Sequence, residues 1–411
     1  MPALSWPGKH LAEPAPASFV TEAVTYPQGQ GYPHAKPENR LILGDNLTTM
    51  TALLPAYEGR IDLIYADPPF FTNKKYPARI GRGEDSRKPQ DWQLAEGYAD
   101  HWPDLDAYLD FLYQRLALMH RLLASSGTLY LHLDWHADAY ARLLLDEIFG
   151  ADNLLNEIIW IYHGPSPIRR AFNRKHDTIL AYVKGAGYTF NADAVRVPYN
   201  LSTVKTFESS PKAGFGKLPD LARGKVPEDW WYFPVVARLH SERTGYPTQK
   251  PEALLERVIL ASSNRGGLIA DFFCGSGTTA LVAARLDRRF IVCDNTWRAV
   301  HTTRSRLAAS RAALFTLERD PSISLPLSPF PYPLSLGADC VTLPPEALPD
   351  LDYWEVDPAW DGEMFKSAAQ AVRPARNGEM PRALHLPEGK TGRRVCVRMV
   401  AVNGGQSQVE L

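Results

Sequence analysis

The feature that most constrains the fold of this 411-residue chain is a strand-length apolar run followed by a glycine-rich turn and a helix-length segment. The apolar run covers residues 268–272, the turn contains Gly275 and Gly277, and a helix is predicted over 278–286. A helix over 251–261 comes before this unit, and a strand over 289–293 comes after it. Strands and helices that alternate in this way form sheets covered by helices. The sequence therefore predicts an α/β fold with a doubly wound, mostly parallel sheet.

The N-terminal half of the chain repeats the same alternation. Residues 71–104 interrupt it with a polar segment rich in Gly and Pro, which is longer than an ordinary connection and predicts a functional loop that is mobile without substrate. The strands of this half are predicted over 40–43, 61–66, 128–133, 157–162 and 177–183, and the helices over 47–56, 105–123 and 137–149.

Shifts in composition divide the chain into four parts. Residues 1–38 are rich in Pro and Ala and predict an N-terminal arm that lies over the surface or is partly disordered. Residues 39–318 hold the strand–helix alternation and form one α/β domain. Eight prolines between 319 and 350 indicate a linker, and residues 351–411 predict a small β-rich appendage. The role of this last region is not indicated by any motif.

Composition restricts the surroundings in which the protein works. Hydrophobic residues make up 45% of the chain, but no apolar run approaches the roughly 18 residues of a membrane span, and no secretory signal is present. We therefore expect a cytoplasmic protein that does not contact a membrane. The cysteines are far apart and form no CxxC pair, so neither a metal site nor a disulfide framework is predicted from Cys274, Cys293, Cys340 and Cys396.

The net charge of −1 leaves any basic surface to local clusters of Lys and Arg. Two such clusters are candidates for a nucleic-acid footprint. One contains Lys74, Lys75, Arg79, Arg82, Arg87 and Lys88, and the other contains Arg169, Arg170, Arg174, Lys175, Lys205, Lys212, Lys217, Arg223 and Lys225.

A short polar motif, Asp67-Pro68-Pro69-Phe70, follows the predicted strand 61–66. The carboxylate of Asp67 only accepts hydrogen bonds, and the backbone carbonyl of Pro68 can accept a second N–H from the same amine. Phe70 offers a ring face on which a base can stack. The motif suits an exocyclic amine as substrate, although Asp and Pro are also ordinary residues of a turn after a strand.

The glycine-rich turn suits a cofactor, because its missing Cβ atoms allow close approach to the backbone and to a helix N-terminus. Asp294 lies 23 positions beyond Asp271, at a spacing that suits ribose hydroxyl groups. The turn also satisfies a dinucleotide fingerprint, so this motif alone leaves an NAD-dependent enzyme open.

The segment from Thr244 to Arg257 closely resembles the segment before the glycine loop in the β group of DNA amino-methyltransferases. These enzymes methylate adenine N6 or cytosine N4 and include modification methylases of restriction systems. The order of the two motifs, Asp-Pro-Pro-Phe first and the glycine loop second, resembles the same group. Further similar segments are 127–134, 156–160 and 176–182, so that the resemblance covers roughly Arg40 to Arg306.

The resemblance implies the methyltransferase fold and S-adenosylmethionine as the cofactor. It assigns Thr248, Lys250 and Pro251 to cofactor positioning. The charges agree, since Lys250 suits the cofactor carboxylate while Asp271 and Asp45 suit its ammonium group. Asp45 also fits a helix N-cap, Lys250 a turn cap and Phe273 a core position. The other predicted cofactor-binding residues are Asn46, Phe273, Gly275, Gly277, Thr278, Asp294 and Asn295.

The activity implied is methyl transfer to the N6 amine of a flipped adenine in double-stranded DNA, by direct in-line attack. Asp at position 67 favours adenine N6 over the alternative, cytosine N4. A catalytically silent DNA-binding subunit is a second alternative. The absence of a Pro-Cys pair excludes a C5-cytosine mechanism.

The resemblance also implies partners. These are double-stranded DNA, with a location at the nucleoid, a second copy of the chain and a cognate restriction or defence subunit. Residues 185–243 are irregular, basic and aromatic, and predict the target-recognition region. We expect His132 and His176 to be structural, and Trp160 and Tyr162 to belong to the core.

Overall fold

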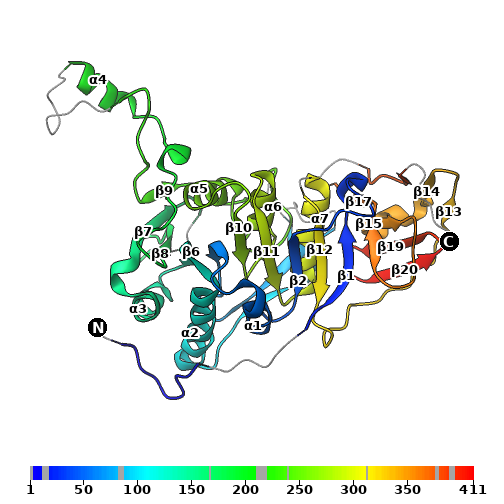
Figure 1. The fold of residues 1–411 in the computed structure, drawn as a ribbon, viewed down its shortest axis with the longest axis horizontal. Coiled ribbons are helices and arrows are strands. Elements are labelled where there is room, and N and C mark those ends of the chain that lie inside the picture. The colour runs from blue at the N-terminus through cyan, green and yellow to red at the C-terminus, as the bar shows by residue number, and fades with distance from the viewer. Residues whose placement is uncertain are drawn as a thin grey trace.

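The computed structural model describes residues 3–11, 18–81, 88–165, 168–209, 220–237, 240–311, 313–374, 379–387 and 394–411. Among these residues, eleven strands form one long sheet in the order β16-β1-β12-β2-β11-β10-β3-β6-β8-β7-β9 (Figure 1). The strands are β1 (Val20–Thr25), β2 (Asn39–Leu43), β3 (Ile61–Ala66), β6 (Leu123–Leu133), β7 (Leu154–Ile161), β8 (His176–Val183), β9 (Trp230–Tyr232), β10 (Leu268–Asp271), β11 (Arg289–Asp294), β12 (Phe315–Arg319) and β16 (Phe365–Ser367).

The centre of this sheet is parallel. Within the run β12-β2-β11-β10-β3-β6, every pair of adjacent strands is parallel. β8 runs antiparallel between β6 and β7, so β7 points in the same direction as β6. The carboxyl ends of β2, β11, β10, β3, β6 and β7 therefore meet at one edge of the sheet, where ligands bind in open α/β folds.

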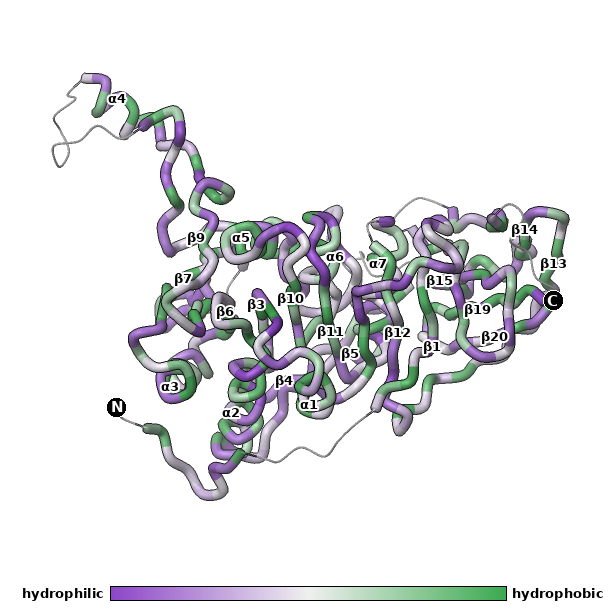
Figure 2. The backbone as a smooth tube through the Cα atoms, in the orientation of Figure 1, coloured by the Kyte–Doolittle hydropathy of each residue, from purple (hydrophilic) through white to green (hydrophobic). Residues whose placement is uncertain are grey.

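Helices cover both faces of the sheet, so its central strands are buried on both sides. Met50 of α1, Leu112 of α2 and Leu144 of α3 belong to one core, and Leu254 of α5 and Val300 of α7 belong to the other. Hydrophobic and hydrophilic stretches alternate along α2 and α3, as expected for helices with one buried face (Figure 2). The predicted doubly wound, mostly parallel α/β sheet is confirmed. The helices are α1 (Asn46–Tyr57), α2 (Leu105–Leu122), α3 (Asp138–Phe149), α5 (Glu252–Ser262), α6 (Thr278–Arg285) and α7 (Trp297–Ser310), with 3₁₀ turns η3 (Ala151–Asn153) and η4 (Ala192–Val195).

The N-terminal segment contributes a strand to the sheet, so the prediction of an arm over 1–38 is wrong for Val20–Thr25. Strand β1 pairs antiparallel with β12, which lies almost 300 residues later in the chain. A short 3₁₀ turn, η1 (Pro27–Gly29), follows it. The sequence signal was weak because the strand is short, is flanked by Pro and Gly, and depends on a distant partner.

The chain beyond Arg319 folds back onto the domain. Strand β16 pairs in parallel with β1 and so extends the main sheet. Within the described residues, the rest forms a four-stranded sheet, β17-β15-β19-β20, and a three-stranded sheet, β13-β14-β18. The predicted β-rich C-terminal region is confirmed, whereas the predicted linker 319–350 contains two strands and a 3₁₀ turn. These elements are β13 (Ser335–Leu336), β14 (Cys340–Thr342), η5 (Pro345–Asp350), β15 (Leu351–Asp357), β17 (Ala369–Val372), β18 (Ala383–His385), β19 (Cys396–Ala401) and β20 (Gln406–Glu410).

Buried charged groups join this C-terminal region to α7. Arg304 of α7 pairs with Glu355 of β15 at 3.5 Å, and both side chains are 1% exposed. His301 of α7 bonds Asp352 at 2.8 Å. Burial lowers the pKa of His301 to about 4, so at neutral pH this side chain is neutral. The C-terminal region is thus packed on the α/β domain and does not form a separate appendage.

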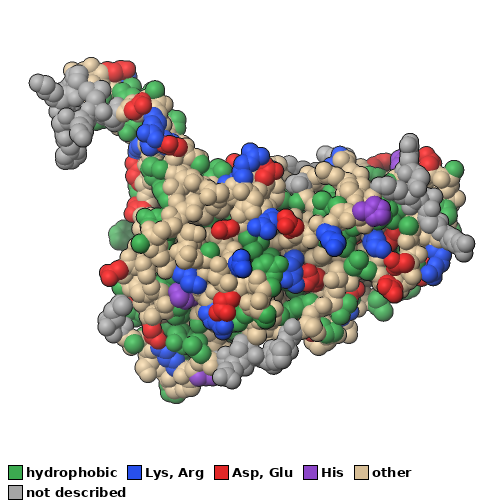
Figure 3. Space-filling model, in the orientation of Figure 1, with side chains coloured by type: hydrophobic (Ala, Val, Ile, Leu, Met, Phe, Trp, Pro, Cys, Tyr) green, Lys and Arg blue, Asp and Glu red, His purple; other side chains and the backbone are tan. Residues whose placement is uncertain are grey.

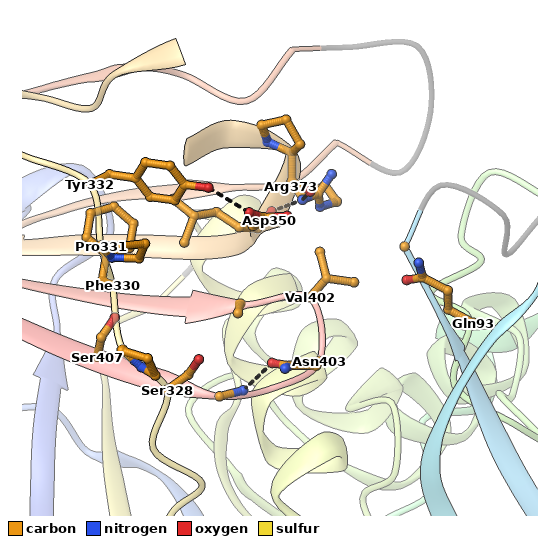
Figure 4. A pocket seen from close by; sticks show the side chains of 16 residues that line it. Gln93, Ser328, Phe330, Pro331, Tyr332, Asp350, Arg373, Val402, Asn403 and Ser407 are labelled. Carbon is orange, nitrogen blue, oxygen red and sulfur yellow. Dashed lines mark hydrogen bonds between the residues drawn. The ribbon is translucent and has the colours of Figure 1, made fainter. Parts of the chain in front are cut away.

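The predicted mobile loop 71–104 contains an antiparallel hairpin of β4 (Lys74–Ile80) and β5 (Gln93–Asp100), and a 3₁₀ turn η2 (Pro89–Asp91). Arg82 and Arg87 of the predicted basic cluster lie outside the described residues. A cavity of about 600 Å³ lies between this hairpin and the C-terminal region. Gln93 faces it from the hairpin, and Tyr332, Arg373 and Asn403 face it from the other side (Figure 4).

A second extension projects from the opposite end of the molecule and carries α4 (Leu201–Ser209) (Figure 1). Basic and acidic side chains are interspersed over the face shown in Figure 3, in keeping with the net charge of −1. Among the described residues, no helix is long and apolar enough to cross a membrane.

Candidate active site

The carboxyl edge of the parallel sheet gathers four of the predicted acidic residues. Asp45 follows β2, Asp294 ends β11, Asp271 ends β10 and Asp67 follows β3. These four strands are consecutive neighbours in the sheet. The sequence motifs, which are more than 200 residues apart at their extremes, therefore lie along one edge.

Asp67 has one partnered and one unpartnered carboxylate oxygen. Lys250 Nζ donates a hydrogen bond to Oδ2, and the side chains of Lys250 and Asp67 are 9% and 17% exposed. The other oxygen, Oδ1, is buried and has no hydrogen-bond partner among the described residues. A buried acceptor of this kind is costly unless something binds it. The sequence analysis placed Lys250 at the carboxylate of the cofactor. In the structure its ammonium group instead bonds Asp67 of the acceptor motif.

The acceptor turn is held by a residue that the sequence analysis missed. Asp100, at the end of β5, is 1% exposed. Its carboxylate accepts hydrogen bonds from the backbone N–H groups of Phe70, Phe71 and Thr72 at 3.1, 3.1 and 2.7 Å, and from the Thr72 hydroxyl at 2.6 Å. Phe71 has a φ of 66°, a left-handed conformation that costs free energy and needs such support. Asp100 lies about 30 residues from the motif, so only the hairpin brings them together.

Two aromatic residues complete this turn. The Tyr108 hydroxyl donates to the Pro69 carbonyl at 2.9 Å, which fixes the second proline of the motif. The ring of Phe70 stacks on His132 with centroids 5.9 Å apart and an interplanar angle of 24°. Lys250 Nζ lies 5.5 Å from the centroid of the Phe70 ring. Phe70 therefore stacks on a buried imidazole and has a cation nearby.

His132 is structural, as predicted, and supports Phe70 from below. It is fully buried and bonds the Tyr65 hydroxyl through Nδ1 at 2.7 Å and Asp177 through Nε2 at 3.2 Å. The Tyr162 hydroxyl donates to the other oxygen of Asp177 at 3.0 Å. His176, by contrast, is exposed at the start of β8. Trp160 is 3% exposed and belongs to the core, also as predicted.

The glycines of the loop lie against side chains of neighbouring segments. Gly277 has a φ of 74° and caps the N-terminus of α6. A Cβ atom there would lie 2.5 Å from Thr303, and one at Gly275 would lie 3.1 Å from Tyr246. Thr278 Oγ1 donates to the Lys250 carbonyl at 3.1 Å, so the loop is tied to the segment that positions Lys250. Only glycine fits at position 277 without displacing a neighbour.

The two acidic residues beside this loop are desolvated. Burial raises the pKa of Asp271 to about 7, although the Thr279 hydroxyl and the Phe273 N–H donate to its carboxylate at 2.6 and 2.9 Å. Burial also raises the pKa of Asp294, which accepts from the Gly275 N–H at 3.0 Å. Asp271 and Asp294 thus shape the loop directly, in addition to any contact with a ligand.

Asp45 and Asn46 are positioned by Arg115, which was not predicted. Asp45 caps α1, as the structural alternative proposed, and accepts from the backbone N–H groups of Leu47 and Thr48. Arg115 of α2 is largely buried and bonds Asn46 Oδ1 at 2.5 Å and Asp45 Oδ2 at 3.1 Å. The amide of Asn46 donates to the Phe272 carbonyl at 2.9 Å. No motif marks Arg115, because it lies inside an ordinary amphipathic helix.

The other predicted cofactor-binding residues are spread over several segments near the sheet edge. Thr248 has a φ of 54° and lies 3.2 Å from the Tyr98 hydroxyl, and Pro251 is the N-cap of α5. Phe273 is half-buried, 6.2 Å from the ring of Phe111. Asn295 is exposed just beyond β11.

The predicted recognition region 185–243 is basic in sequence but largely paired in the structure. Arg223 and Arg196 both contact Asp193, at 2.8 and 2.6 Å, and Lys225 bonds Glu228. Trp231 is buried at 8% exposure, whereas Trp230 and Tyr232 are exposed. Lys212 and Lys217 lie outside the described residues.

The residues at the sheet edge fit S-adenosylmethionine. The glycine loop follows β10 and starts α6, whose N-terminal N–H groups favour an anionic group. The acidic Asp294 ends the next strand, and the buried Oδ1 of Asp67 has no hydrogen-bond partner among the described residues. Open α/β sheets bind ligands at the carboxyl ends of their strands, which is where these residues lie. A family model described as DNA methylase matches residues 61–305, well over half of the chain. The chain therefore belongs to this family of N6 and N4 DNA methyltransferases.

The chain is similar to individual known proteins. The DNA adenine methyltransferase YhdJ of Escherichia coli (strain K12) is 32% identical over 255 residues, covering 61% of this chain and 76% of the relative. The type II methyltransferase M.HpaI of Haemophilus parainfluenzae is 30% identical over 271 residues, covering 66% and 74%. The solved M1.HpyAVI–SAM complex is 19% identical, with a TM-score of 0.43 and coverage of 65% and 98%. The predicted resemblance to DNA amino-methyltransferases of restriction systems is confirmed, and with it S-adenosylmethionine as the cofactor.

Proposed function

We propose that this protein transfers a methyl group from S-adenosylmethionine to the N6 amine of an adenine flipped out of double-stranded DNA. The observation that carries the proposal is the buried, unpartnered Oδ1 of Asp67, beside a ring that can stack on a base. Adenine N6 is a weak nucleophile, because its lone pair is delocalised into the ring. A carboxylate that accepts one of its N–H groups favours the more tetrahedral nitrogen that attacks.

In this proposal each residue of the acceptor site has a separate role. Asp67 Oδ1 accepts one N–H of the amine, and the Pro68 carbonyl accepts the other. Phe70, held by His132, supports the plane of the base. Lys250 fixes the second carboxylate oxygen of Asp67, so that the free oxygen keeps its direction. S-adenosylmethionine, when bound at the glycine loop, supplies an electrophilic methyl group on a sulfonium. Catalysis then comes from positioning and from electrostatic stabilisation, without a covalent enzyme intermediate.

The cofactor-binding residues are part of the same proposal. We assign Asp45, Asn46, Thr248, Pro251, Asp271, Phe273, Gly275, Gly277, Thr278, Asp294 and Asn295 to this site, together with the ammonium group of Lys250 at its border with Asp67.

Mass spectrometry of nucleosides tests the proposal. Unmethylated duplex DNA is incubated with the protein and S-adenosylmethionine, with Asp67→Ala run in parallel. We expect N6-methyladenine from the wild-type protein, none from the variant, and retained cofactor binding in the variant. N4-methylcytosine would instead assign the sister activity, and turnover by Asp67→Ala near the wild-type rate would contradict the role of Asp67. Cofactor and DNA binding without any product would indicate a silent DNA-binding subunit.

The proposal extends to partners. Likeness to a type II methyltransferase agrees with a cognate restriction or defence subunit. A homodimer and a location at the nucleoid are proposed from the family resemblance alone. Light scattering of the purified protein measures its molar mass in solution and so distinguishes a monomer from a homodimer. Co-purification from the native host tests for a second, different subunit.

A further inference from the structure

A fully exposed phenylalanine lies among arginines at the edge of the sheet that holds Asp67. Phe172 is 99% exposed, the highest value among the exposed large hydrophobic side chains that the structure describes. It lies in the basic loop, residues 168–175, between β7 and β8. Single exposed apolar side chains are common and need no explanation. The surroundings of Phe172 are what make it informative.

The arginines of the basic loop have no acidic partners. Arg169, Arg170 and Arg174 are exposed and form no ion pair with any residue that the structure describes. This differs from the recognition region, where Arg196, Arg223 and Lys225 are neutralised by Asp and Glu. Unpaired arginines on a protein of net charge −1 concentrate positive potential at this loop.

The stem of the loop is connected to the candidate active site. The Tyr162 N–H donates to the Lys175 carbonyl at 3.1 Å, and Lys175 Nζ donates to the Pro165 carbonyl at 3.0 Å, which closes the stem. The Tyr162 hydroxyl bonds Asp177, which bonds His132, on which Phe70 stacks. Strand β7 is three strands from β3 in the sheet, so the loop begins about 14 Å from Asp67 by normal strand spacing.

A second aromatic side chain lies beside the loop. The guanidinium of Arg174 lies 4.1 Å from the ring centroid of Trp135, which follows β6 at the same edge and is 48% exposed. Arg174 is thus oriented by a cation–π contact while its charge stays available to solvent. Arginines contact phosphates, and apolar wedges insert between base steps and occupy space in the stack.

We propose that Phe172 is a wedge that enters the base stack of double-stranded DNA while Arg169, Arg170 and Arg174 hold the flanking phosphates. This inference deepens the proposed function, because it rests on DNA as the substrate and names the residue that occupies the gap left by the extruded base. A second copy of the chain is a less suitable occupant, since two such loops would repel each other.

The test uses a sequence-independent probe. Fluorescence anisotropy measures binding of the full chain to a mixed-sequence 30-base-pair duplex and to the same duplex with one central abasic site. The abasic site provides a gap that a wedge can fill without unstacking a base. We expect wild type to prefer the abasic duplex by about tenfold. Phe172→Ala should reduce this preference to about onefold and Phe172→Trp should keep it. Leu327→Ala, which removes a side chain that is 87% exposed in the C-terminal region, is the matched control.

Two outcomes would overturn the inference. These are equal binding of both duplexes by wild type, and a preference that persists in Phe172→Ala. The double variant Arg169→Ala, Arg170→Ala should lower the slope of log K against log salt by about two, while the preference remains. The methylation assay is independent of this ratio. A Phe172-dependent preference without any methylated product would refute the proposed chemistry and leave the wedge standing, whereas product formation without the preference would do the reverse.

Discussion

Lys250 donates a hydrogen bond to Asp67, and this contact joins the cofactor-side segment before α5 to the acceptor turn after β3. The two residues are 183 positions apart. Because both are mostly buried, each is the main compensation for the charge of the other. The pair places a positive charge at the boundary between the two halves of the proposed site.

Replacing Lys250 separates two roles for this cation. If Lys250 orients Asp67, Lys250→Met lowers kcat by at least about tenfold, equivalent to about 1.4 kcal/mol, and changes the cofactor Kd little. Calorimetric titration with S-adenosylmethionine and single-turnover methylation measure the two quantities. Lys184→Met is the control, since that lysine bonds the Leu123 carbonyl at 2.6 Å, away from the site. A large loss of cofactor affinity with unchanged kcat would instead restore the role predicted from sequence.

Asp100 should act as a positioning residue for the acceptor turn. In Asp100→Asn one oxygen becomes an amide donor that faces other donors, so the hydrogen bonds to that oxygen are lost: those of Phe70 and Thr72 if it replaces Oδ2, or that of Phe71 if it replaces Oδ1. Hydrogen bonds to charged groups contribute about 1.5–3 kcal/mol, so we expect kcat to fall by about 10- to 100-fold. Cofactor affinity should stay within about threefold. Glu96→Gln, an exposed substitution on the same strand β5, should leave both unchanged, and equal effects of the two variants would exclude this role.

Gly277→Ala should destabilise the protein through two separable effects. The left-handed backbone costs about 1–3 kcal/mol, and the contact with Thr303 at 2.5 Å adds a steric cost. Urea denaturation of the single variants and of Gly277→Ala with Thr303→Ala measures the coupling. The double variant should recover the steric part. Gly266→Ala, at a φ of 75° with nothing within 4 Å, should show the backbone cost alone. Equal losses in the two glycine variants would mean that Thr303 yields without cost.

Asp271 should make stability depend on pH. Burial raises its pKa from 3.8 to about 7, so the folded protein binds this proton more tightly than the unfolded chain. The stabilisation is fully present below about pH 4, decreases as the pH rises to about 7, and is absent above that range. Asp271→Asn removes this dependence. We expect the stability of the variant relative to wild type to improve by up to about 1.4 kcal/mol per pH unit between pH 5 and 7 and to be constant above pH 8. A constant difference from pH 5 to 8 would contradict the raised pKa.

The periodic parts of the fold were predictable from sequence. Strand 61–66 and the helix from 105 were predicted almost to the residue, because the local hydrophobic pattern determines both. The glycine loop was likewise predictable, since its backbone conformation allows few other residues. Strand β1 and Asp100 were not, because each depends on a partner that is distant in sequence. The ion pair of Lys250 with Asp67 could not be predicted either, because the two residues are 183 positions apart and a lysine has several possible acceptors.

The pairing of β16 with β1, together with the buried contact of Arg304 and Glu355, has a consequence for how such chains diversify. A relative could not exchange its C-terminal region for an unrelated one by a simple crossover after β12. A replacement region would have to supply a strand that pairs with β1 and an acidic side chain that pairs with the buried Arg304 of α7. Inheritance of the C-terminal region is therefore tied to residues inside the methylase domain, and the two should vary together as one unit.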